Sequence, residues 1–229
     1  MIVPGQFAGV TAQAETPEQV IPYVCAVSDL KPRMLGPCVG YEREGEVVLV
    51  GYPLHDPKDT GAMAEAVSLA LRLPGLRRIT VIGPARPPQA PKSAAIEEDW
   101  YYSLPVPVSP PGQKTRNLLR RAGRELTVER GGAWGEDHTA LVRRYLNERS
   151  LAAGIRHIYK RLPRYLAESS SSLLVSARLA DGRLAALSVG EYAGLATAFY
   201  MFSFRDPGIA PPGATDLLLA QLLEEASER

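Results

Sequence analysis

Residues 196–204 read ATAFYMFSF, residues 205–214 read RDPGIAPPGA, and residues 215–223 read TDLLLAQLL. The first stretch is rich in aromatic residues and predicts a β-strand. The second is a loop rich in glycine and proline, and the third predicts an amphipathic helix with Thr215 or Asp216 as its N-cap. A strand that enters a helix through such a loop offers an anion the backbone N–H groups and positive dipole of the helix start. The unit predicts a phosphate-binding site, with an ordinary strand-to-helix connection as the alternative.

Three consecutive antiparallel strands are predicted up to this loop. Residues 172–180 and 183–192 form a hairpin around Asp181-Gly182, because Asp-Gly tolerates the positive φ that a tight turn needs. Residues 195–204 form the third strand. Further upstream the pattern predicts one short strand and two helices, at residues 126–129, 137–149 and 155–168. A Rossmann fold would alternate strands and helices, so this order argues against one.

The order of these elements resembles the GNAT acyltransferase superfamily. The resemblance rests on ADGRLAA at residues 180–186 and GATDLLL at residues 213–219, and it extends over about residues 100–229. Within the superfamily, the chain is most similar to the Fem-type and lipid aminoacyltransferase-like branch, because GQKTRNLLRRA at residues 112–122 resembles the basic helix that precedes the core there. The resemblance implies an α/β (α+β) fold with a mixed, mainly antiparallel sheet flanked by helices. It also implies an acyl- or aminoacyltransferase.

The family's phosphate-binding pattern, Gln/Arg-x-x-Gly-x-Gly/Ala, can be aligned with this chain in two registers. In the first, residues 205–210 match the pattern but lie three residues before the predicted helix. In the second, which is aligned on the start of the helix, Gly213 matches a glycine of the pattern, but Ala210 stands where the pattern has Gln or Arg. In the family the domain continues with further strands, and its cofactor cleft opens where the fourth strand separates from the fifth. The resemblance therefore implies that the C-terminal part is incomplete at Arg229. The N-terminal half, a partner chain or a longer chain would then supply the missing strand.

The resemblance also implies a donor site. The donor is expected to be acetyl-CoA or another acyl-CoA, with aminoacyl-tRNA left open. Its phosphates would meet backbone donors of the loop, and its arm would follow the exposed edge of the last strand. The expected cofactor-binding residues are Phe202, Phe204, Arg205, Gly208, Gly213, Ala214, Thr215, Arg116 and Arg120.

Three residues on the central strands are the catalytic candidates. Glu191 would accept a proton from an amine acceptor, and Tyr200 or Ser203 would return one to a leaving thiol or hydroxyl. The alternative for each is a polar edge to a packed sheet. No metal site is expected, because the three histidines lack the i, i+4 spacing of a helical metal site: His55, His138 and His157.

Charge is distributed unevenly along the chain. Residues 114–164 carry 13 Lys or Arg and 5 Asp or Glu, whereas residues 1–113 carry 9 and 12 and residues 165–229 carry 4 and 8. On the predicted helix that begins near Lys114, arginines recur every four residues and so share one face. This face is interpreted either as a cradle for the phosphates of CoA or tRNA, or as a solvated surface.

Residues 1–108 are predicted to form a smaller α/β lobe, and residues 109–229 the GNAT-like lobe. The N-terminal lobe is either a degenerate GNAT-like repeat or an unrelated module. A helix is expected to open at Thr16-Pro17, with Thr16 as its N-cap. The remaining elements are a hairpin at residues 36–42 and 46–53, a helix at 60–73, a buried strand at 78–83 and a strand at 100–106.

Composition limits the remaining alternatives. The chain is 45% hydrophobic and 22% charged, and none of its apolar runs approaches the roughly 20 residues of a membrane span. Its start lacks the basic region of a signal peptide, and Cys25 and Cys38 lack metal-site spacing, so a cytoplasmic protein with reduced thiols is expected. The acceptor would be a small-molecule or peptide amine, with a homodimer left open. The alternative function is a non-catalytic GNAT-like scaffold that binds nucleic acid or a protein partner.

Overall fold

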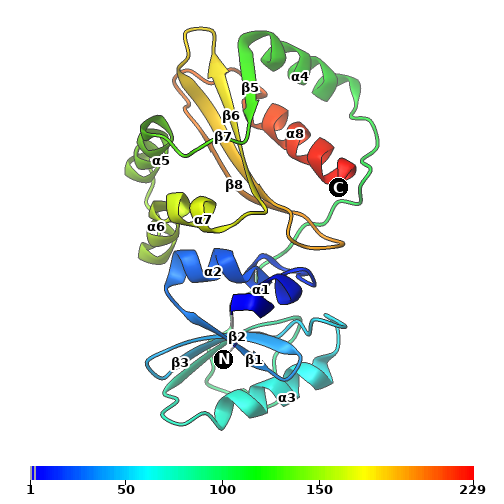
Figure 1. The fold of residues 1–229 in the computed structure, drawn as a ribbon, viewed down its shortest axis with the longest axis vertical. Helices are drawn as coiled ribbons and strands as arrows, with labels where there is room; N and C mark the ends of the chain where they lie inside the picture. The colour runs from blue at the N-terminus through cyan, green and yellow to red at the C-terminus, as the bar shows by residue number, and fades with distance from the viewer. Residues whose placement is uncertain (1, 3) are drawn as a thin grey trace. The chain divides into compact units, whose positions relative to one another are not determined.

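The computed structural model describes residue 2 and residues 4–229, and the chain divides into two compact units (Figure 1). The first unit comprises the chain up to Tyr101 together with Ala193–Thr197, and the second comprises Tyr102–Tyr192 and Ala198–Arg229. Each unit builds one four-stranded sheet flanked by helices. The predicted mixed α/β class with mainly antiparallel sheets is therefore confirmed.

The first unit is a β-meander followed by a helical crossover. Strands β1, β2 and β3 pair antiparallel, and β4 returns parallel to β3 after helix α3. In chain order the elements are α1 (Pro4–Thr11), the 3₁₀ turn η1 (Pro17–Gln19), α2 (Ile21–Ser28), β1 (Lys31–Leu35), β2 (Cys38–Arg43), β3 (Glu46–Val50), α3 (Thr60–Leu71) and β4 (Arg78–Ile82).

Both faces of this first sheet are covered because apolar side chains alternate along its strands. Val39 and Tyr41 of β2 belong to the core that includes Ile21 of α2. Cys38 of β2 and Leu49 of β3 belong to the core formed with α3. The sequence predicted the hairpin and α3, whose positions are confirmed.

Several expectations for the N-terminal half are wrong. Strand β1 was missed, since Pro32 argues against a central strand; β1 lies at the sheet edge, where proline is tolerated. Residues 100–106 form no strand, and Trp100 is 78% exposed. Strand β4 is half-exposed rather than buried. Thr16 is an N-cap with Pro17 in the first turn, as expected, but the helix it opens is only the short 3₁₀ turn η1 before α2.

The second unit is a fully antiparallel sheet in the order β5-β6-β7-β8. Helices α4 and α8 cover one face, and α5, α6 and α7 cover the other (Figure 1). In chain order the elements are α4 (Gln113–Glu125), β5 (Leu126–Arg130), α5 (Glu136–Glu148), α6 (Ala153–Lys160), α7 (Leu162–Glu168), β6 (Ser172–Leu179), β7 (Leu184–Glu191), β8 (Phe199–Arg205) and α8 (Ala214–Glu228).

The predicted meander and the hairpin at Asp181-Gly182 are confirmed. The turn differs from the expected two-residue one, because only Gly182 has a positive φ, of 86°, and residues 180–182 connect Leu179 to Arg183. The single helix expected over residues 155–168 is instead two helices, α6 and α7, which meet at Arg161. The break follows from Pro163, which has no N–H for the carbonyl four residues earlier and occupies the first turn of α7.

The two units share a run of elements. The first has α1, α2, three antiparallel strands and then α3, and the second has α5, α6 with α7, three antiparallel strands and then α8. The first unit adds β4 after this run, and the second adds β5 before it. This common order is compatible with the first of the two alternatives for the N-terminal lobe, a degenerate repeat.

Candidate functional site

Strand β8 provides an open sheet edge in the second unit. It pairs with β7 and, among the described residues, with no other strand. An unpaired edge presents backbone N–H and C=O groups that can accept an extended ligand. The strand leads directly into the loop and the helix that the sequence singled out.

The loop after β8 is organised around Asp206. This residue is only 4% exposed, and its backbone N–H donates to Ala185 O at 2.8 Å. Its carboxylate accepts the Gly208 N–H at 2.9 Å and Arg144 Nη1 of α5 at 2.5 Å. The Gly208 N–H, which we expected to face a phosphate, is thus engaged inside the protein. Sequence reasoning missed the role of Asp206, although Asp-x-Gly after a strand is a recognisable turn signal.

Helix α8 begins two or three residues earlier than predicted. Its N-cap is Gly213 at φ 89°, so the expectation of Thr215 or Asp216 as N-cap is wrong; they are the second and third residues of the helix. A Cβ at Gly213 would lie 2.7 Å from Leu118 Cγ, so glycine permits the close approach of α4. Ala214 N donates to Pro211 O at 3.2 Å. The N–H groups of Thr215 and Asp216 belong to the first turn, where a helix provides no internal acceptor.

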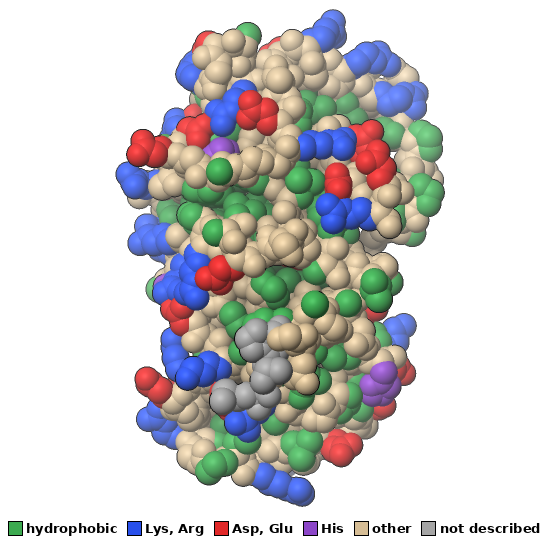
Figure 2. Space-filling view, in the orientation of Figure 1, with side chains coloured by type: hydrophobic (Ala, Val, Ile, Leu, Met, Phe, Trp, Pro, Cys, Tyr) green, Lys and Arg blue, Asp and Glu red, His purple; other side chains and the backbone are tan. Residues whose placement is uncertain are grey.

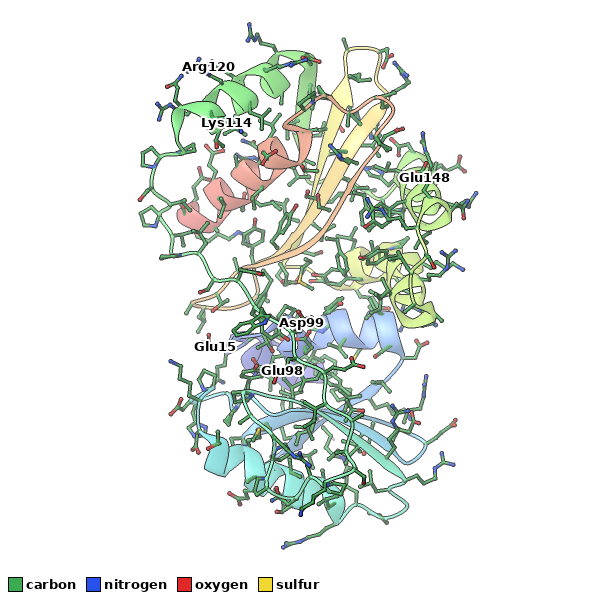
Figure 3. All side chains as sticks on the ribbon, turned by 180° about the vertical axis from the view of Figure 1, so that it is seen from behind. Glu15, Glu98, Asp99, Lys114, Arg120 and Glu148 are labelled. Atoms are coloured by element: carbon green, nitrogen blue, oxygen red, sulfur yellow. The ribbon has the colours of Figure 1, made fainter. Side chains whose placement is uncertain are left out.

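Helix α4 packs against α8 and carries the predicted arginines. Arg116 donates to Pro111 O at 2.7 Å and to Gln113 Oε1 at 2.6 Å, and Arg120 donates to Asn117 Oδ1 at 3.3 Å. These partners are neutral, and within the described chain neither guanidinium forms an ion pair. Figure 3 labels Lys114 and Arg120 on this helix, and Figure 2 shows Lys and Arg side chains gathered over it at the upper right. The helix therefore presents uncompensated positive charge beside α8.

The catalytic candidates do not converge. Glu191 is fully buried, and its carboxylate accepts Tyr165 Oη at 2.6 Å and Ser169 Oγ at 2.8 Å, on the α7 side of the sheet. Ser203 Oγ accepts the Ser188 hydroxyl at 3.0 Å. Tyr200 is 49% exposed at the sheet edge.

Alternation along β8 explains the separation of Glu191 from Ser203. Phe202 and Phe204 flank Ser203, and their rings contact Tyr159 of α6 at centroid distances of 5.8 and 5.1 Å. Ser203 therefore faces the opposite side of the sheet, toward α8. The two phenylalanines, expected beside the cofactor, are core residues beneath α5 and α6, and Arg205 is exposed where β8 ends.

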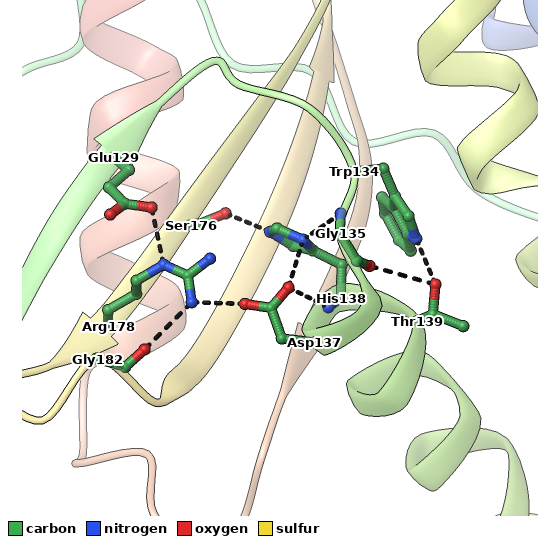
Figure 4. Close-up of polar contacts among 9 residues, drawn as sticks. All are labelled: Glu129, Trp134, Gly135, Asp137, His138, Thr139, Ser176, Arg178 and Gly182. Atoms are coloured by element: carbon green, nitrogen blue, oxygen red, sulfur yellow. Dashed lines mark hydrogen bonds and ion pairs between the residues drawn. The ribbon is translucent and has the colours of Figure 1, made fainter.

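A buried polar network, unrecognised in the sequence, joins α5 to the sheet (Figure 4). The Gly135 N–H lies 3.0 Å from His138 Nδ1, which also lies 3.0 Å from Asp137 Oδ1. On the other side of the ring, His138 Nε2 and Ser176 Oγ are hydrogen-bonded at 2.9 Å. Arg178 joins the network through Asp137, at 2.5 Å. Burial is the main cause that lowers the pKa of His138, and it outweighs the opposing effect of the Asp137 carboxylate.

The network fixes the start of α5 on strand β6. Within the part of the chain that the structure describes, no group of three or more His, Cys, Asp and Glu residues is arranged to hold a metal ion. None of the described helices is both long and apolar enough to cross a bilayer.

No family model and no curated protein matches the chain. Among solved structures, the chain is similar to L-PGS (lysyl-phosphatidylglycerol synthase) from Bacillus licheniformis, with 12% identity and a TM-score of 0.48. The similarity covers 90% of this chain and 67% of that one. At this level of similarity, function has to be inferred from the geometry of the chain's own residues.

Proposed function

We propose that the second unit is a GNAT-type acyl- or aminoacyltransferase lobe whose donor lies along the open edge of β8. The observation that carries the proposal is one continuous arrangement. An unpaired edge strand leads through residues 206–213 into the first turn of α8, and the positively charged helix α4 packs beside it. The amide groups of a pantetheine arm would extend the sheet, and the donor's phosphates would meet the helix start and the arginines.

The proposed reaction is direct transfer to an amine. The amine nitrogen attacks the donor's carbonyl carbon; a C–N bond forms, and the C–S bond of a thioester or the C–O bond of an aminoacyl ester breaks. The amine loses one proton to solvent or a base, and the leaving thiolate or alkoxide gains one. Of the three candidates, Tyr200 is the exposed one at the sheet edge, so we assign to it the donation of a proton to the leaving thiolate or alkoxide. Glu191 would instead position α7 and β7.

The donor is assigned to the second unit because the equivalent place in the first unit is filled. There β3 and β4 stay paired to their ends, and the Gly51 N–H donates to Ile82 O at 2.6 Å. The Met63 side chain lies against both Gly51 and Gly83, where added Cβ atoms would fall 2.8 and 2.9 Å from it. No room is left there for a pantetheine arm between the two strands.

The test is calorimetric titration with acetyl-CoA, desulfo-CoA and tRNA in parallel. The decisive variant is Thr215→Pro, which deletes one first-turn N–H of α8 without removing a hydrogen bond internal to the helix. The chain already places Pro22 and Pro163 in the first turns of α2 and α7, so this variant is expected to fold. Thr215→Ala, which keeps the N–H, is the matched control. Donor affinity should fall about tenfold in the proline variant alone.

Equal affinities in the two Thr215 variants would remove the start of α8 from the donor site. The alternative function, a non-catalytic scaffold, is favoured by the unpaired charges of Arg116 and Arg120 together with the separation of Glu191 from Ser203. It predicts that neither CoA ligand binds. Binding of tRNA alone would fit both the scaffold and an aminoacyl-tRNA donor, and transfer of the aminoacyl group to an amine would then distinguish the two. Binding of CoA and desulfo-CoA would contradict the scaffold function.

A further inference from the structure

A cavity of about 220 Å³ lies in the second unit between α5 and the α6–α7 pair, on the sheet face away from α8. Its apolar wall includes Trp134, Val142, Leu146, Tyr159 and Pro163. Figure 2 shows hydrophobic side chains gathered over these helices, with Lys and Arg side chains at the outer margin. The cavity lies on the α5 side of the sheet, whereas the proposed donor phosphates meet α8 on the other side.

The sequence builds this cavity from a regular helical pattern. Thr139, Val142, Arg143 and Leu146 stand at positions i, i+3, i+4 and i+7 of α5 and so line one face of it. The interruption of the helix between α6 and α7 places Pro163 opposite these residues.

Contacts with neighbouring side chains fix the two aromatic residues of the cavity wall. Trp134 Nε1 donates to Thr139 Oγ1 at 2.8 Å, and the indole lies against the His138 ring at a centroid distance of 5.4 Å. Tyr159 packs edge-on against Phe202 and Phe204. Both aromatic walls are thereby fixed before any ligand arrives, which lowers the cost of binding.

The charges at the cavity all have one sign. Arg143 and Lys160 line it, and no carboxylate does. Within the described chain neither cation forms an ion pair, and both side chains are exposed. A mostly apolar cavity with two unpaired cations fits an apolar molecule that bears one negative charge.

We propose that this cavity binds a compact aromatic monocarboxylate. Its ring would pack against Trp134 and Tyr159, and its carboxylate would meet Arg143 and Lys160. The volume sets the size, because about 220 Å³ is below the roughly 300–1,000 Å³ of sites for drug-sized ligands. A single ring with a short acidic side chain matches both the space and the charge.

The experiment uses Trp134 as its own reporter. The chain has two tryptophans, and Trp100 is 78% exposed, so Trp100→Phe leaves Trp134 as the single indole. Titration of this full-length variant with 3-phenylpropionate should change the Trp134 emission with a dissociation constant in the millimolar range. The neutral analogue 3-phenylpropan-1-ol should bind about tenfold more weakly.

Charge variants complete the test. Arg143→Gln with Lys160→Gln should weaken 3-phenylpropionate about tenfold and leave the alcohol unchanged. Lys92→Gln, an exposed change in the first unit, should affect neither. No emission change, or equal binding of acid and alcohol, would overturn the proposal. Thr215→Pro should leave this titration intact, so failure here is distinguishable from failure of the donor site.

Discussion

His138 ties the start of helix α5 to strand β6, and it does so as a neutral ring. Burial lowers its pKa below the unperturbed value of about 6.5. Below that value the unfolded chain binds more protons at this residue than the folded chain. Protonation therefore favours unfolding. The stabilising contribution is fully present above about pH 6.5 and is lost as the pH falls from there through the lower pKa of the folded state.

We predict that His138→Gln removes most of this pH dependence. Glutamine still offers an acceptor to the Gly135 N–H but loses the bond to Ser176, so stability near pH 7.5 should fall by about 1 kcal/mol. Urea unfolding between about pH 7.5 and pH 5 measures both effects. The exposed His157→Gln is the control and should keep the wild-type slope. The Asp137 carboxylate, whose pKa is lowered, acts in a separate window below about pH 4.

At the scale of elements, the contact between α4 and α8 depends on one glycine. Gly213 adopts φ 89°, and a Cβ there would lie 2.7 Å from Leu118 Cγ and 3.1 Å from Leu118 O. Gly132 adopts a similar φ of 93° with nothing within 4 Å of its Cβ position. Comparing alanine substitutions at these two glycines separates the cost of backbone strain from the cost of displacing α4, because only a Cβ at Gly213 would meet a neighbouring helix.

We predict that Gly132→Ala costs about 1 kcal/mol and Gly213→Ala about 2 kcal/mol or more. The first loss is backbone strain alone, and the second adds the displacement of α4. Urea unfolding of both variants at one pH gives the difference. Equal losses of stability would show that α4 can be displaced without an energetic penalty and that its position does not depend on Gly213.

Local patterns in the sequence predicted several elements because their signals are strong. Asp181-Gly182 marked the β6–β7 hairpin, and the apolar spacing of α3 marked that helix. Other features depend on tertiary context. Residues 100–106 look like a strand, but Pro105 has no N–H for a ladder, and among the described residues the segment pairs with no strand.

The candidate site was harder to predict from the sequence than the fold. Its strand, loop and helix were predicted, but the hydrogen bond that engages the Gly208 N–H inside the protein depends on the position of the Asp206 carboxylate. Glu191 of β7 and Ser203 of β8 are separated because their side chains lie on opposite faces of the sheet. Strand β7 is buried along its whole length, so alternation of polar and apolar residues did not distinguish its faces.

At the scale of the whole molecule, positive charge is concentrated in one stretch of the chain. Residues 114–164 carry 13 basic and 5 acidic residues, and the stretches on either side are acidic overall. Several of these cations are already compensated, as in the Arg121–Glu125 pair of α4 at 3.2 Å. Arg116 and Arg120 have only neutral partners. A polyanion attracted to α4 would therefore meet these two guanidiniums without displacing an ion pair.

We predict that tRNA affinity falls with salt and that Arg116→Gln with Arg120→Gln makes the fall shallower. Removal of one arginine–phosphate interaction should lower the slope of log K against log salt by about 0.7 to 0.9, so the double variant should reduce it by about 1.5. Arg164→Gln with Arg183→Gln is the matched control: it removes the same charge from arginines that pair with Glu168 and Asp181. An unchanged slope in the first variant would assign the α4 arginines to a solvated surface. An equal reduction of the slope in both would show that net charge, rather than the face of α4, governs the attraction.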